Sequence, residues 1–125
     1  MERILIVDDD IYMCKSLSYV LKDEGYGVDT AYDPNSALNM FKRKQFDLVL
    51  MDYKLSGIPD MTGLWLLEKV KEINPAIKAI MISAYGDRNV KEKARKIGAD
   101  YFLDKPFLLT GLLKKVKSSL VKGKE

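Results

Sequence analysis

Reactive polar side chains follow short apolar runs of this sequence, and together they suit one kind of chemistry. They are the acidic pair Asp8 and Asp9, then Asp52, Ser83 and Lys105. Carboxylates about 4 Å apart repel each other by about 4 kcal/mol per pair at an effective dielectric of roughly 20, so three of them brought together need a compensating cation. Mg²⁺ binds carboxylate and water oxygens and leaves positions for phosphate. The set therefore suits the binding of a divalent cation and the handling of a phosphoryl group.

Each of these residues on its own has an ordinary structural explanation. An acidic residue between a strand and a helix usually caps the helix, and we expect Asp10 to do so. A lone serine such as Ser83 usually bonds to the backbone of its own turn. A free lysine is normally a solvated charge, but Pro106 restricts Lys105 to extended geometry and makes a cis peptide bond accessible, which can aim the ammonium group inward. The functional interpretation therefore depends on whether these side chains converge.

Five short apolar runs have the composition of strands that are covered on both faces. They are Arg3 to Val7, Val28 to Ala31, Leu48 to Met51, Ile77 to Ile82 and Tyr101 to Leu103. Between them the apolar residues recur with a period of about 3.6 residues, as on one face of a helix, in stripes that include Met13, Leu64 and Leu109. The helix start and stop signals agree with this pattern. Asp33 followed by Pro34 is a typical helix start, and Gly25 and Gly98 stand where helices should end.

This strict alternation predicts an α/β fold with right-handed crossovers. We expect a flavodoxin-like, doubly wound sheet of five parallel strands in the order 2-1-3-4-5, with five helices on its two faces. The carboxyl ends of the strands then line one crevice, and the switch point lies between the first and third strands. The fold therefore predicts that Asp8, Asp9 and Asp52 converge.

The amino-acid composition indicates one globular domain and excludes several kinds of site. The chain has 125 residues, of which 47% are hydrophobic and 31% charged, as in one globular domain. It has no histidine and a single cysteine, Cys14, so a zinc site, a His-based triad and an internal disulfide are all excluded by inventory. Any metal must be a hard ion held by oxygen. The apolar runs are too short to span a bilayer, and we expect a cytoplasmic protein without membrane contact.

The net charge of +3 is unevenly distributed along the chain. Residues 1 to 85 hold 10 basic and 13 acidic residues, whereas residues 86 to 125 hold 11 basic and 5 acidic ones. The excess lies mostly on helical stretches where lysine faces solvent, so a solvated face explains it better than nucleic-acid binding. We expect no direct contact with nucleic acid.

Taken in order, several segments resemble the receiver domain of bacterial two-component response regulators over residues 2 to 121. The matching segments are Ile4 to Asp9, Asp47 to Asp52, Met81 to Gly86, Gly98 to Asp100 and Asp104 to Phe107. Any one of them is common, but all of them at these spacings are highly specific. The resemblance implies a phosphorylation-activated signalling domain over residues 1–125, with a core at 2–121 and a short polar tail at 122–125.

The resemblance also implies the roles of the acidic residues. Asp52 is expected to be the phosphoacceptor, taking its phosphoryl group from the phospho-His of a sensor histidine kinase or a phosphotransfer protein. Asp9 is expected to be the direct Mg²⁺ ligand, with Mn²⁺ as a possible substitute. Asp8 would act mainly through water, and the main-chain carbonyl of Lys54 would complete the coordination.

Three further residues carry the expected switch. By the same resemblance Ser83 binds a phosphoryl oxygen, Lys105 contacts the phosphate, and Phe102 is the switch aromatic, at a position where tyrosine is commoner. The output surface is expected on the fourth helix, fifth strand and fifth helix, facing an unknown downstream partner or output domain. We expect a monomer or a phosphorylation-dependent dimer, and no enzyme activity beyond the domain's own phosphorylation and dephosphorylation.

One stretch departs from the family pattern, and two other functions compete with this interpretation. The stretch Ser56 to Asp60 is expected to be a loop inserted beside the site, where together with Lys54 and Tyr85 it would shield the phosphoryl group from water. A haloacid-dehalogenase-type phosphohydrolase would also use an Asp at a strand end with Mg²⁺, but it needs a second Asp where this chain has Lys54. A flavodoxin-like binder would need a phosphate loop after the first strand, where Asp8 and Asp9 stand instead.

Overall fold

Strands and helices alternate along the whole described part of the chain. The computed structural model describes residues 1–55, 61–84 and 88–121. The predicted inserted loop at 56–60 and Tyr85 lie outside the described residues. The elements are β1 (Arg3–Val7), α1 (Ile11–Asp23), β2 (Gly27–Ala31), α2 (Pro34–Arg43), β3 (Leu48–Asp52), α3 (Gly63–Ile73), β4 (Lys78–Ser83), α4 (Arg88–Ile97), β5 (Tyr101–Asp104) and α5 (Leu109–Ser119). Among the described helices, none has the length and apolar character that crossing a membrane requires.

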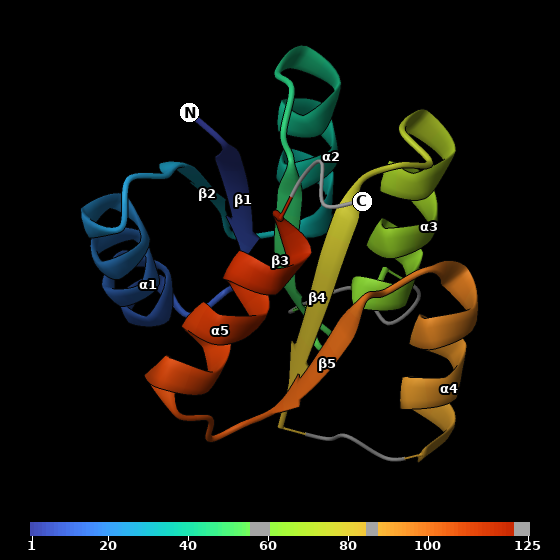
Figure 1. Cartoon of the computed structure of the whole chain (residues 1–125). Helices are drawn as coiled ribbons and strands as arrows, with labels where there is room; N and C mark the ends of the chain where they lie inside the picture. Colours follow the sequence, from blue (N-terminus) through green and yellow to red (C-terminus); the bar gives the residue numbers. More distant parts are fainter. Residues whose placement is uncertain (56–60, 85–87, 122–125) are drawn as a thin grey trace.

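The strands form one parallel sheet in the order β2-β1-β3-β4-β5, as predicted (Figure 1). The third, fourth and fifth strands each end one residue later than the sequence indicates. Asp52 and Ser83 are therefore the last residues of β3 and β4 and take part in strand pairing, Asp52 opposite Ile82 and Ser83 opposite Asp104. Because strand pairing holds the backbone of Asp52 and of Ser83, the Cα atoms of both residues have fixed positions.

Alternate residues of the sheet pack into two separate cores. Leu5, Val49 and Met81 face α2, α3 and α4, whereas Ile6 and Leu50 face α1 and α5. Figure 1 shows α1 and α5 together on one side of the sheet. Each fully buried aliphatic side chain contributes roughly 1.5 to 3 kcal/mol, so the two faces determine the pairing register.

Neighbouring residues of β5 are divided between these cores. Phe102 packs against the core under α2, α3 and α4, and Tyr101 packs against the core under α1 and α5. The two aromatic side chains therefore point to opposite faces of the sheet. Phe102 thus belongs to the α4 side of the sheet.

The helix ends lie where local sequence predicts them. Asp10 Oδ1 accepts a hydrogen bond from Met13 N at 3.1 Å at the start of α1, and Asp33 caps α2 ahead of Pro34. Gly25 and Gly98 have φ values of 100° and 128°, a region that disfavours side chains. The caps at Asp10 and Asp33 thus end the loops that follow β1 and β2.

The helix stripes differ from the expected ones at a few positions. Cys14 and Leu66 are fully buried, whereas Met13 and Leu64 of the expected stripes are only half-buried. Leu109 was expected in the core and is 41% exposed. It is the first residue of α5 and lines an open apolar groove together with Pro106 and Phe107.

Candidate functional site

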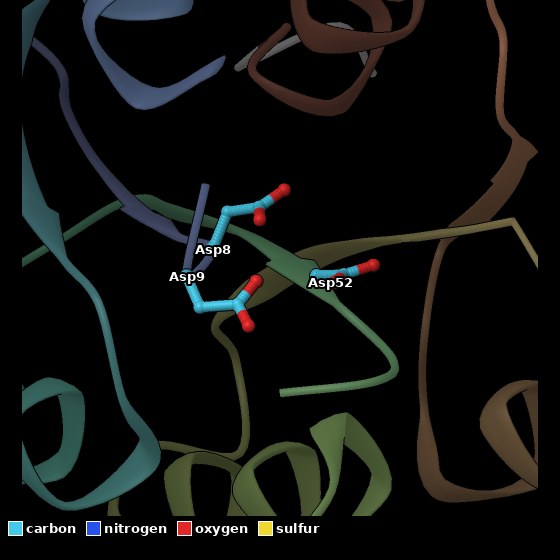
Figure 2. Close-up of side chains that lie close together, drawn as sticks. All are labelled: Asp8, Asp9 and Asp52. Carbon is cyan, nitrogen blue, oxygen red and sulfur yellow. The ribbon is translucent and has the colours of Figure 1, made fainter. Parts of the chain in front are cut away.

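Three carboxylates meet at the carboxyl end of the sheet. Val7 pairs with Met51 across β1 and β3, so the next residues, Asp8 and Asp52, lie level with each other. One carboxylate oxygen each from Asp8, Asp9 and Asp52 lies within 4.8 Å of the others. Figure 2 shows the three side chains at the ends of these two strands. The predicted convergence is therefore present in the structure.

The three carboxylates have different surroundings. Asp8 is 4% exposed; its Oδ1 accepts from Asp10 N at 2.9 Å and its Oδ2 accepts from Lys105 Nζ at 3.1 Å. Asp9 is exposed, and no described residue donates a hydrogen bond to it. Asp8 is therefore already engaged within the protein, and Asp9 offers its oxygens outward.

Lys105 places one ammonium group between two of these acids. Its Nζ lies 3.1 Å from Asp8 Oδ2 and 3.5 Å from Asp52 Oδ1. Its backbone N donates to Ser83 O at 2.9 Å, and the bond to Pro106 is cis. Burial alone would lower the pKa of Lys105, but Asp8 and Asp52 outweigh it and raise that pKa. The lysine is therefore a permanent cation of the site.

A single ammonium group does not balance the acidic cluster. Burial raises the pKa of Asp52 from 3.8 to about 6; the nearby Asp8 adds to the rise, and Lys105 opposes it. The side chain of Asp52 is only 7% exposed, so water stabilises its negative charge little. When Asp52 is ionised, Lys105 alone does not neutralise the nearby negative charges. Three carboxylate ligands whose negative charge is not fully compensated suit a hard divalent cation such as Mg²⁺.

The raised pKa of Asp52 predicts a pH-dependent penalty on folding. Because the folded-state pKa of about 6 exceeds the ordinary 3.8, ionisation costs stability. The penalty is absent below the ordinary pKa, grows as the pH rises towards 6, and is complete above it. Without metal at pH 8, Asp52→Asn should raise the free energy of unfolding by about 2 kcal/mol.

Urea unfolding in excess chelator between pH 4 and 8 measures this difference. The difference in the free energy of unfolding between Asp52→Asn and the parent should shrink towards zero near pH 4, and Mg²⁺ should reduce it at pH 8. Asp23→Asn, at an exposed position on α1, is the matched control and should follow the parent. A gain in stability that is the same at every pH would show that ionisation of Asp52 is not its cause.

Three more predicted site residues lie around this cluster. Ser83 is fully buried at the end of β4, beside the strand that ends in Asp52. Phe102 is half-buried on β5, farther from the acids, and lines a hollow of about 170 Å³ between α4 and β5. Lys54 is exposed, two residues after Asp52. The role expected for its main-chain carbonyl stays a prediction.

Gly63 supports the site, although it has no reactive side chain that would mark it in the sequence. Its N donates to Tyr53 O at 2.7 Å, and a Cβ at this position would lie 2.5 Å from Asp52 O. The start of α3 therefore packs directly on the backbone of Asp52. The signal in the sequence is a glycine just after Thr62, the residue whose hydroxyl caps α3.

Comparison with known proteins agrees with this geometry. The family model of the response regulator receiver domain matches residues 4–117. The chain is 34% identical over 119 residues to sporulation initiation phosphotransferase F of Bacillus subtilis, covering 95% of this chain and 94% of that protein. It is also 34% identical over 122 residues to the transcriptional regulatory protein ZraR of Salmonella typhimurium, covering 98% of this chain but 27% of that protein. The chain thus spans about a quarter of that longer relative.

A solved structure shows the same likeness in three dimensions. The CheY-like response regulator receiver domain protein of Methanospirillum hungatei superposes with a TM-score of 0.89 at 37% identity, covering 94% of this chain and 92% of that one. These matches leave the phosphohydrolase and flavodoxin-like alternatives without support. Fold, acidic cluster and relatives lead to one assignment: the chain belongs to the response regulator receiver domain family.

Proposed function

We propose that Asp52 is the phosphoacceptor of this receiver domain. The observation that carries the proposal is a buried carboxylate at a strand end, 3.5 Å from an ammonium group and beside two further acids. A carboxylate oxygen of Asp52 attacks phosphorus, the bond from phosphorus to the donor's histidine nitrogen breaks, and the histidine regains a proton. Transfer of this kind depends mainly on positioning and on positive charge around the phosphoryl oxygens.

Asp8, Asp9 and Asp52 are the residues that would hold Mg²⁺, or Mn²⁺ in its place. The exposed Asp9 has oxygens available for direct coordination, whereas Asp8 already accepts from Asp10 N and Lys105 and therefore acts through water. Bound there, the cation supplies positive charge for the phosphoryl oxygens. The main-chain carbonyl of Lys54 is proposed as a further ligand, on the family resemblance alone.

The two acids should therefore differ in their effect on metal affinity. We expect Asp9→Asn to weaken Mg²⁺ binding more than 100-fold, because it removes a direct ligand. Asp8→Asn should weaken it about 10- to 100-fold, as is typical of groups that act through a ligand. Titration calorimetry measures both, and Asp10→Asn, which changes only the helix cap, should stay near the parent. Equal losses in the two variants would contradict the ordering.

Phosphorylation is proposed to act on the ends of β4 and β5 together. Lys105 N already donates to Ser83 O, so these two strand ends are joined by a main-chain bond. A phosphoryl group on Asp52 offers oxygens to the Ser83 hydroxyl and to Lys105, and Phe102 then changes position. The output surface on α4, β5 and α5 is repacked as a result. The domain is thus a signalling switch whose only chemistry is its own phosphorylation and dephosphorylation.

An apolar groove next to Lys105 is proposed as the docking surface for the phospho-His donor. The groove has a volume of about 520 Å³. Its lining residues are Met13, Leu17, Ala84, Lys105, Pro106, Phe107 and Leu109. Because Lys105 belongs both to this groove and to the acidic cluster, a protein bound here is beside Asp52. Exposed Leu108, next to Leu109 of the lining, extends the apolar surface.

Phosphotransfer from a protein tests the function and this surface together. The parent should accept a phosphoryl group from at least one of a panel of phosphorylated histidine kinases, in the presence of Mg²⁺. Leu109→Lys should slow that transfer at least about tenfold, because it places a charge in an apolar contact, and should leave labelling by acetyl phosphate unchanged.

Tyr19→Lys, on exposed α1 surface away from the groove, is the control and should transfer like the parent. A parent that accepts phosphoryl groups from neither proteins nor acetyl phosphate would contradict the function. Equal slowing of both donors in Leu109→Lys would contradict only the docking surface.

A further inference from the structure

One lysine of α4 contacts β5 at two points. Lys91 Nζ lies 5.5 Å from the centroid of the Phe102 ring and 3.1 Å from Asp104 Oδ2. Phe102 and Asp104 are alternate residues of one strand and therefore project on the same side of the sheet. The Lys91 side chain is 41% exposed, so its ammonium group stays solvated while it bridges the ring and the carboxylate. A single side chain thus connects the aromatic residue to the end of its strand.

The aromatic residue has no polar atom by which to be held. A tyrosine at position 102 would present a hydroxyl group, but phenylalanine offers only its ring face and edge. A cation over the ring face is then the polar contact available to it. At partly exposed sites, a cation–π contact changes an equilibrium constant by roughly two- to fivefold, and an ion pair by about the same amount or less.

The ring also lies beside open space. Phe102 lines the hollow of about 170 Å³ between α4 and β5, together with Lys91, Ala94 and Ala99. Small alanine side chains on the wall leave room for a ring to move. Movement away from its present position would, however, break the contact with the Lys91 ammonium group. The contact therefore favours the position seen here over any other.

The carboxylate that Lys91 holds is adjacent to the acidic cluster. Asp104 directly precedes Lys105, whose Nζ contacts Asp8 and Asp52. Asp104 also pairs with Ser83 across β4 and β5. The bridge from Lys91 therefore reaches the same strand ends on which a phosphoryl group at Asp52 would act.

We propose that Lys91 is a positioning residue that holds Phe102 in its unphosphorylated position and so sets the threshold of the switch. This inference rests on the proposed function, in which Phe102 moves when Asp52 is phosphorylated. Because movement of the ring would break this contact, Lys91 shifts the equilibrium towards the position seen here, which we take as the inactive one. A ligand that binds the active position then shows a weaker apparent affinity, in proportion to the small active fraction.

Neighbouring cations on α4 provide a matched comparison. Lys93 and Lys96 are exposed and form no ion pair or ring contact with a described residue. Arg95 pairs with Glu92 on the same helix. Among the α4 cations of the described chain, Lys91 is the one that bridges to β5. Removing Lys93 therefore changes the charge of α4 equally without touching Phe102.

The test is titration with beryllofluoride, a phosphoryl mimic, in the presence of Mg²⁺. Lys91→Met keeps the length of the side chain and removes the charge, and it should tighten apparent beryllofluoride binding about two- to tenfold. Lys91→Arg and Lys93→Met should bind like the parent. Asp104→Asn, which removes only the ion pair, should fall between the parent and Lys91→Met.

The ring of Phe102, followed by ¹³C NMR, gives a readout that simple stabilisation would not move. In Lys91→Met without ligand, its signals should shift towards those of the beryllofluoride-bound parent. Unchanged signals with unchanged affinity would overturn the proposal, as would weaker binding in Lys91→Met, which would mean that Lys91 supports the active position. A parent that does not respond to beryllofluoride would instead contradict the proposed function.

Discussion

Asp52→Asn is expected to abolish phosphorylation of this protein. The amide has no nucleophilic carboxylate oxygen. Neither neighbouring acid replaces it, because both Asp8 oxygens are engaged and the exposed Asp9 has no ammonium partner among the described residues. Incubation with acetyl phosphate and Mg²⁺, followed by mass spectrometric mapping, should give one adduct in the parent, at Asp52. The expected loss is complete, since the nucleophile itself is removed.

Two comparisons make the result specific. Asp23→Asn, at an exposed position on α1, should be labelled like the parent. Excess chelator should suppress labelling of the parent, because the acidic cluster would then lack the cation that its charge requires. Unchanged labelling of Asp52→Asn, or full labelling of the parent in chelator, would exclude Asp52 as a metal-dependent phosphoacceptor.

Lys105→Ala is expected to separate metal binding from the response. Without metal the variant should lose about 3 kcal/mol of stability, because the buried Asp8 carboxylate loses its partner at 3.1 Å. Mg²⁺ should bind as tightly as in the parent or more tightly, since a competing cation is gone. Beryllofluoride should no longer change the ¹³C signals of Phe102, because the link from the phosphoryl oxygens to β5 is missing.

Chemical unfolding with and without Mg²⁺, calorimetry and NMR measure these three effects. Lys78→Ala, at the exposed start of β4, is the control for loss of a lysine and should behave like the parent. A Lys105→Ala variant that is as stable as the parent and responds normally to beryllofluoride would mean that Lys105 is only a solvated charge.

Local sequence determined the elements of this protein and their approximate ends. Apolar runs such as Leu48 to Met51 predict buried strands, and Asp10, Asp33 and Gly25 set helix ends through their own backbone geometry. Alternating elements then leave few topologies, so the strand order followed as well. Even the convergence of the acids was predictable, because it requires only the topology.

The family resemblance implied that the converging residues divide their roles, but only the tertiary structure supplies the physical reason. Asp8 and Asp9 are adjacent and identical in type, yet one is buried against Lys105 and the other is exposed. The raised pKa of Asp52 and the bridge from Lys91 to Phe102 likewise depend on distances between residues far apart in the chain. Such distances come from strand register and helix packing summed over the whole core, and a difference of a few ångströms decides whether charges pair or repel.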